Sequence, residues 1–162
     1  MTGAPELVDE SRLRAVFRAL ADKRVDYAVF GGVALGLHGL ARATADLDLF
    51  VAPDRENIER LKSALRAVFD DPSIDEISAE DLCGEYPAVR YGPPDGFGFD
   101  ILTRLGSVVR YADLEIEIKP FADVAVRVVS ARNLWKLKKG TVRPVDRIDA
   151  RALADRFGFE DD

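Results

Sequence analysis

Two short apolar runs within residues 27–52 are each broken at a position where chemistry is expected. The first run ends in the pair Gly31-Gly32, and the second carries Asp46 and Asp48 two residues apart. Side chains two apart on a β-strand point to the same face, so the two carboxylates should lie together. Mg²⁺ is held by carboxylates and substrate phosphates, and glycine lets backbone approach a phosphate closely. The segment therefore predicts a metal–nucleotide site.

Periodicity, capping residues and turn residues predict alternating helices and strands along the whole chain. Helices are expected at residues 9–23, at 33–39, after the cap residue Asp54, from Ser130 to about residue 139, and at 146–157. Strands are expected at residues 25–30, 47–52, 87–91, 97–102, 114–118 and 124–129. No repeat or long linker divides the chain. Residues 1–162 are thus predicted to form one α+β domain, with helices on a mixed sheet and frayed ends at 1–8 and 158–162.

Composition is that of a globular protein, with 162 residues, 48% of them hydrophobic and 32% charged. No apolar stretch is long enough to span a bilayer, and the N-terminus lacks the features of a signal peptide. Cys83 stands alone, which excludes an internal disulfide and agrees with a reducing compartment, so a cytoplasmic protein without membrane contact is expected. The net charge of −6 disfavours tight, sequence-independent binding to nucleic acid.

The motifs around the two aspartates form a joint pattern. Residues 31–35 read Gly-Gly-Val-Ala-Leu, residues 38–39 read His-Gly, and residues 42–49 read Arg-Ala-Thr-Ala-Asp-Leu-Asp-Leu. This pattern resembles the nucleotidyltransferase superfamily, and more closely its small bacterial members of the AbiEii toxin type. The resemblance implies a nucleotidyltransferase-like fold in which a mixed β-sheet is packed with helices.

A third carboxylate is expected at Asp100, which interrupts the apolar strand at 97–102. In the family that this chain resembles, a third acid lies on a strand next to the pair and acts as a metal ligand or general base. Asp95 and Asp113 compete for the role, but both lie in turn-like sequence. Asp46, Asp48 and Asp100 are therefore the predicted catalytic and metal-binding residues.

The predicted nucleotide-binding residues are Gly31, Gly32, Arg42, Thr44 and Lys138. The two glycines would offer backbone donors, because Gly32 stands where many superfamily members have a serine. Arg42 and Thr44 either contact the triphosphate and a metal-bound water or make ordinary loop contacts, and the sequence leaves both open. Lys138 matches the family's phosphate-binding lysine.

Other polar residues near these motifs have simpler expected roles. Lys136 is a close rival of Lys138 for the phosphate. Asp146 and Asp149 are expected to join two helices by ion pairs. The sole histidine, His38, is expected to pack or to hydrogen-bond within a loop, since no nucleophile pattern accompanies it.

The resemblance implies transfer of a nucleotidyl group from an NTP to a hydroxyl acceptor, with two Mg²⁺ ions and release of pyrophosphate. The acceptor could be tRNA, a protein or a small molecule, and a cognate antitoxin or other partner protein is expected. The alternative is a non-catalytic protein that keeps the fold and binds an NTP or a partner.

Overall fold

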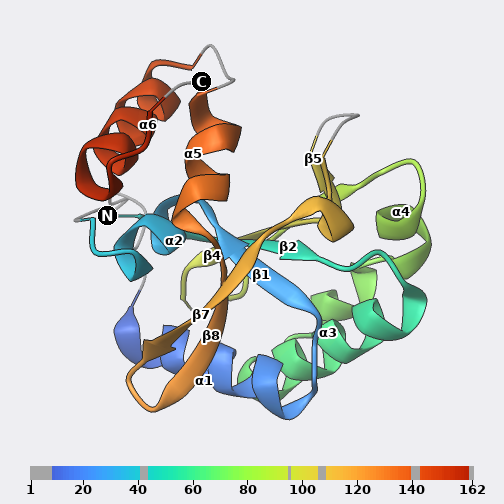
Figure 1. The fold of residues 1–162 in the computed structure, drawn as a ribbon. Coiled ribbons are helices and arrows are strands. Elements are labelled where there is room, and N and C mark those ends of the chain that lie inside the picture. Colours follow the sequence, from blue (N-terminus) through green and yellow to red (C-terminus); the bar gives the residue numbers. More distant parts are fainter. Residues whose placement is uncertain (1–8, 41–43, 95, 106–108, 140–142, 161–162) are drawn as a thin grey trace, which may run out of the picture.

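The computed structural model describes residues 9–40, 44–94, 96–105, 109–139 and 143–160. Its main sheet has six strands in the order β3-β4-β2-β1-β8-β7 (Figure 1). The pairs β1–β8 and β2–β4 are parallel and the other pairs antiparallel, which confirms the predicted mixed sheet. The strands are β1 (Tyr27–Phe30), β2 (Asp46–Val51), β3 (Ala88–Tyr91), β4 (Gly98–Leu102), β7 (Ile116–Phe121) and β8 (Val124–Val129). A separate short ladder joins β5 (Arg104–Leu105) to β6 (Val109–Arg110).

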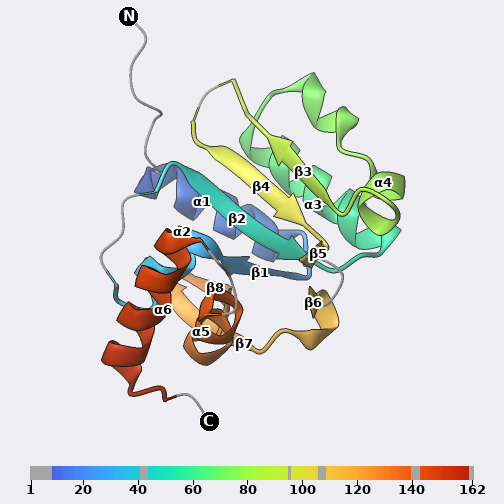
Figure 2. The same cartoon turned by 90° about the horizontal axis from the view of Figure 1, so that it is seen from above.

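The helices lie on opposite sides of this sheet. In Figures 1 and 2, α1 (Glu10–Asp22) and α3 (Arg55–Val68) lie together on one side, and α5 (Ala131–Lys139) and α6 (Pro144–Phe157) stand together on the other. The short α2 (Gly31–Leu37) connects β1 to the segment before β2. Smaller elements are the 3-10 helices η1 (Pro72–Glu76) and η2 (Tyr111–Asp113) and the helix α4 (Ala79–Cys83).

Three helices begin directly after a residue whose side chain caps them, and two of these caps, Asp54 and Ser130, were predicted. The side chains of Asp9, Asp54 and Ser130 each accept a hydrogen bond from a backbone N–H in the first turn of α1, α3 and α5. Such bonds satisfy donors that the helix itself cannot pair. The apolar stripes of α1 and α3 are buried in a core that they share with the inner faces of β1, β2 and β4.

Several element bounds differ from the sequence prediction, among them the start of α6, which is Pro144 and not residue 146. β7 continues to Phe121, past the predicted end at residue 118, because it pairs with β8 along its whole length. Pro120 is tolerated within β7 because β7 is an edge strand of the described sheet. Helix α2 starts at Gly31 and not at Val33, and the short elements η1 and α4 were not predicted.

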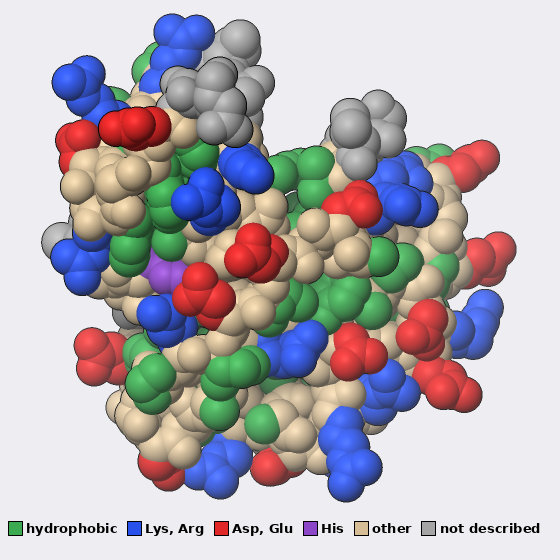
Figure 3. All heavy atoms as spheres, viewed as in Figure 1, with side chains coloured by type: hydrophobic (Ala, Val, Ile, Leu, Met, Phe, Trp, Pro, Cys, Tyr) green, Lys and Arg blue, Asp and Glu red, His purple; other side chains and the backbone are tan. Residues whose placement is uncertain are grey.

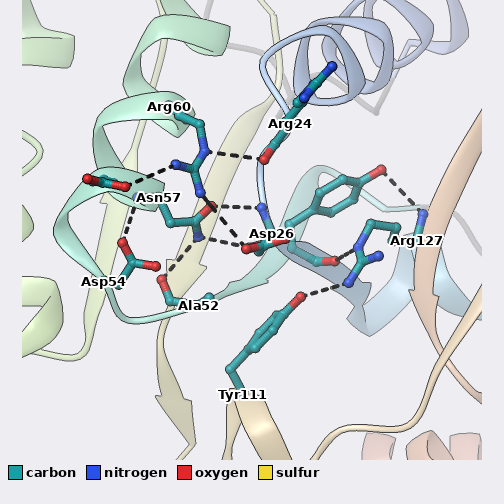
Figure 4. A network of polar contacts seen from close by, with 10 residues as sticks. Arg24, Asp26, Ala52, Asp54, Asn57, Arg60, Tyr111 and Arg127 are labelled. Atoms are coloured by element: carbon teal, nitrogen blue, oxygen red, sulfur yellow. Dashed lines mark hydrogen bonds and ion pairs between the residues drawn. The ribbon is translucent and has the colours of Figure 1, made fainter.

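A buried asparagine fixes α3 to the ends of β1 and β2 (Figure 4). Asn57 is fully buried, and its Nδ2 donates to the carbonyl oxygens of Asp26 at 2.9 Å and Ala52 at 3.0 Å. Its Oδ1 accepts from the Asp26 N–H at 2.7 Å. In the same network Arg127 of β8 donates to the Tyr27 carbonyl at 2.8 Å, which ties β8 to β1. These bonds hold the strands in register at the end where Tyr27 pairs with Val51.

The surface has mixed charge. Figure 3 shows Lys and Arg side chains interspersed with Asp and Glu side chains over one face of the molecule. Within the described ranges, no helix combines the length and the apolar character that crossing a membrane requires.

Candidate active site

The register of two parallel strands brings the three predicted carboxylates to one face of the sheet. Asp48 of β2 lies directly across from Asp100 of β4, and Asp46 lies across from Gly98. All three aspartates are partly exposed, whereas the residues between them, Leu47 and Phe99, are fully buried. The alternation predicted from the sequence is therefore present on both strands.

The three carboxyl groups are close enough to influence each other electrostatically. Burial raises the pKa of Asp48 to about 7, helped by the charge of Asp100, by a hydrogen bond with it and by the charge of Asp46. The positive charge of Lys138 acts in the opposite direction. A site of this kind favours the approach of a cation, because a cation relieves the repulsion among the carboxylates.

A cation of the protein already lies against two of these carboxylates. Arg90 of β3 pairs in register with Asp100, and its Nη1 lies 3.1 and 3.2 Å from the two Asp100 carboxylate oxygens. Its Nη2 donates to Oδ1 of Asp46 at 2.7 Å. Arg90 was not among the predicted site residues, although two predicted strands at 87–91 and 97–102 with a glycine-rich turn between them indicate a hairpin that would set Arg90 beside Asp100.

Two glycines let the aspartates pack against backbone. Gly31 has φ +70°, and a Cβ added there would overlap Oδ2 of Asp48. A Cβ on Gly98 would come within 2.8 Å of Asp46 Oδ1 and 2.9 Å of Arg90 Nη2. Larger residues at these positions would displace the carboxylates, so the local sequence is adapted to the position of the acids.

The remaining predicted residues of the glycine–aspartate segment have distinct positions. Thr44 donates from its hydroxyl to the Asp46 carbonyl at 3.0 Å and so fixes the entry into β2. Gly32 lies partly exposed in the first turn of α2. Arg42 lies outside the described residues, as does the rival acid Asp95. The other rival, Asp113, accepts from the Arg110 N–H at 3.0 Å within η2.

Lys138 is enclosed between α5 and α6. Its Nζ lies 3.2 Å from Asp146 Oδ1 and 3.1 Å from Asp149 Oδ2, and all three side chains are at most 14% exposed. The expectation that these aspartates join two helices by ion pairs is confirmed. Lys138 is also near enough to Asp48 to lower its pKa, whereas Lys136 is exposed on α5.

His38 has a structural position. Its ring is buried, and Nε2 lies 2.8 Å from the Val129 carbonyl oxygen at the end of β8. This contact holds the end of α2 to the sheet. The expectation of packing and hydrogen bonding is confirmed.

The donor set suits a hard divalent cation, although no metal cluster is formed in the structure. Across the described part of the chain, no group of three or more His, Cys, Asp or Glu side chains is arranged to hold a metal ion. The oxygen ligands of Asp46, Asp48 and Asp100 nevertheless share one face, and Arg90 shows that positive charge is accommodated there. Carboxylate oxygens are donors that Mg²⁺ prefers, so the chemistry of these three side chains suits the ion although they are not grouped around a metal position.

Solved structures with low sequence identity share this fold. ANT(2″)-Ia in complex with adenylyl-2″-tobramycin superposes with a TM-score of 0.54 at 14% identity, covering 92% of this chain and 89% of that one. A protein from Thermotoga maritima assigned as a nucleotidyltransferase gives 0.52 at 13% identity, covering 90% and 89%. An antigenic nucleotidyltransferase-like protein from Paracoccidioides brasiliensis gives 0.55 at 19% identity, covering 94% and 79%. These likenesses show a nucleotidyltransferase fold.

The sequence itself matches one family over most of its length. None of the curated proteins matches the chain. Residues 14–135 match the family described as nucleotidyl transferase AbiEii toxin, type IV toxin–antitoxin system. The match contains Asp46, Asp48 and Asp100 and ends before Lys138. The chain belongs to the AbiEii family of nucleotidyl transferase toxins.

Proposed function

We propose that this protein transfers a nucleotidyl group from an NTP to a hydroxyl acceptor and releases pyrophosphate. The observation that carries the proposal is the β2–β4 register, which sets Asp48 opposite Asp100 with Asp46 on the same face. Three carboxylates at adjoining positions of a partly exposed sheet face are unfavourable unless positive charge is supplied. Arg90 supplies part of that charge, and the divalent cations that accompany a nucleoside triphosphate would supply the rest.

Asp46, Asp48 and Asp100 would hold two Mg²⁺ ions. Bound Mg²⁺ neutralises the charge of the triphosphate and makes the acceptor hydroxyl easier to deprotonate. In the reaction, the acceptor oxygen attacks the α-phosphorus, the bond from that phosphorus to the bridging oxygen of pyrophosphate breaks, and pyrophosphate leaves. Asp100, whose side chain is 39% exposed against 32% for Asp46, would take the hydroxyl proton.

The residues around the acids would position the nucleotide. Gly31 and Gly32 would bring backbone close to the phosphates, and the absence of a Cβ at Gly31 keeps Asp48 in place. Thr44 would orient Asp46 through its bond to the Asp46 carbonyl. Lys138 would add positive charge near Asp48, and Arg42 would contact the triphosphate.

The family and its structural neighbours support a choice of acceptors and a partner to test. A toxin of a type IV toxin–antitoxin system implies a cognate antitoxin. ANT(2″)-Ia was solved with an adenylylated aminoglycoside, so a small hydroxyl compound belongs among the acceptors to test. The intermixed surface charge in Figure 3 offers no broad basic field for RNA on that face, but tRNA and protein acceptors are tested in the same way.

The test is transfer of label from each of the four α-labelled NTPs to total RNA, total protein and an aminoglycoside, with and without Mg²⁺. Wild-type protein should label one acceptor class, and Asp48→Asn should lower the rate at least about a hundredfold, because charge stabilisation of several kcal/mol is lost. The matched control is Asp123→Asn, since Asp123 is an exposed aspartate that pairs with arginines of α1 before the start of β8, at the opposite end of the strands from Asp48. Absence of labelling by wild type with every NTP and acceptor, or equal rates for Asp48→Asn and wild type, would overturn the proposal. NTP binding without transfer would establish the non-catalytic alternative.

A further inference from the structure

The guanidinium of Arg90 lies between the carboxylates of Asp46 and Asp100. It donates to one Asp46 oxygen and lies within hydrogen-bonding distance of both Asp100 oxygens, at 2.7 to 3.2 Å. Gly98 leaves room for the guanidinium in this position, because a Cβ at residue 98 would come within 2.9 Å of Arg90 Nη2. Arg90 thus forms a two-sided ion pair across β3, β4 and β2, which is more specific than a single surface contact.

We propose that Arg90 is an internal counter-cation that competes with the divalent metal for Asp46 and Asp100. The inference rests on the proposed function, since it concerns the same carboxylates. A metal ion bound to these oxygens and a guanidinium at hydrogen-bonding distance from them use the same lone pairs, and the two positive charges repel each other. Metal therefore binds fully only when the guanidinium has moved away, and Arg90 sets the metal affinity of the free protein.

The surroundings of Arg90 allow this movement. Its side chain is 60% exposed, so leaving the acids does not require the core to open. β3 is an edge strand of the described sheet, and a cavity of about 290 Å³ lies beside it. Arg90, Tyr91 and Glu76 are among the residues that line the cavity. Glu76 thus adds an acidic residue to the lining of the cavity that Arg90 also borders.

Metal affinity measured without nucleotide tests the inference. Calorimetric titration with Mn²⁺ alone should give a dissociation constant about threefold to tenfold lower for Arg90→Gln than for wild type, because two partly exposed ion pairs no longer compete. The matched control is Arg14→Gln, since Arg14 is a half-exposed arginine that pairs with Asp123 before the start of β8, and its Mn²⁺ affinity should equal that of wild type. Thermal unfolding of all three proteins checks that they are folded.

A second measurement on wild-type protein follows the guanidinium directly. The Nε–Hε resonance of Arg90, assigned by its absence in Arg90→Gln, should shift as Mg²⁺ is added and saturate with the metal. Unchanged or weaker Mn²⁺ binding by Arg90→Gln, or a resonance that Mg²⁺ does not move, would overturn the inference. If wild type still binds Mn²⁺ and transfers label, the proposed function stands without it. If neither wild type nor Arg90→Gln binds Mn²⁺ and wild type transfers no label, both fail.

Discussion

Two glycines of the same short helix should respond to alanine in opposite ways. Gly31 opens α2 with φ +70°, and a Cβ there would overlap Oδ2 of Asp48. Gly36 lies in the same helix, is exposed, and has open space where a Cβ would be added. The two substitutions therefore lie in the same helix and differ in whether the added methyl group meets Asp48.

The expected magnitudes follow from backbone and packing. In Gly31→Ala the left-handed φ costs about 1 kcal/mol, and displacing Asp48 costs about 1–3 kcal/mol more. Gly31→Ala should therefore destabilise the protein by about 2–4 kcal/mol. Gly36→Ala should stabilise it by about 0.5–1 kcal/mol, because alanine is the better helix former and meets no neighbour.

Urea unfolding followed by linear extrapolation measures both effects, and the label-transfer assay measures their consequence for the site. In buffer without urea, where both variants are folded, Gly31→Ala should lose most of its transfer activity and Gly36→Ala should keep its activity. Equal stability of Gly31→Ala and wild type would refute the reasoning about the backbone. A destabilised but fully active Gly31→Ala would show that the position of Asp48 does not matter for the reaction.

Three further changes test the scaffold. Asn57→Ala should cost about 2–4 kcal/mol in urea unfolding, because three backbone groups lose their hydrogen-bond partner, and equal stability would contradict this. Lys138→Met should cost about 3–5 kcal/mol, since it removes a buried ammonium from two buried aspartates, whereas exposed Lys136→Met should stay within about 0.5 kcal/mol. Hydrogen bonds from Tyr91 and then Ser73 lower the pKa of Asp71, so this carboxylate stabilises the fold above its unfolded pKa of about 4, and the contribution is lost as pH falls through the lower folded value. In Tyr91→Phe the pKa of Asp71, followed by NMR, should rise toward its ordinary value, and an unchanged titration would contradict the assignment.

Hydrophobic alternation and capping residues predicted the elements whose bounds depend on nearby residues. Strand β8 was expected at residues 124–129 and has those bounds, because its alternating valines face the core. The caps at Asp54 and Ser130 mark helix starts for the same reason, since each satisfies donors within its own first turn. The pairing of Asp46 and Asp48 on one face follows from strand geometry alone.

Features that depend on contacts between different elements were harder to predict from the sequence. The extension of β7 past Pro120 depends on pairing with β8, which no local pattern reveals. The enclosure of Lys138 depends on how α5 meets α6, so its alignment with a phosphate-binding lysine gave no hint of two aspartate partners. Arg90 required the hairpin register between β3 and β4 to be worked out, and only then does it meet Asp100.

At the candidate site, the residues that leave room for the acids are not all the residues that would stabilise the fold best. Gly98 stands in a strand, where glycine is unfavourable, and Gly31 holds a backbone angle that other residues adopt only with strain. Both glycines border an aspartate oxygen, and Gly98 also borders the Arg90 guanidinium. Without the acids a larger residue would suit the strand at Gly98, whereas the backbone angle at Gly31 favours glycine in any case. Gly98 is therefore the local choice that weakens its own strand, and it borders Asp46 and Arg90 of the candidate site.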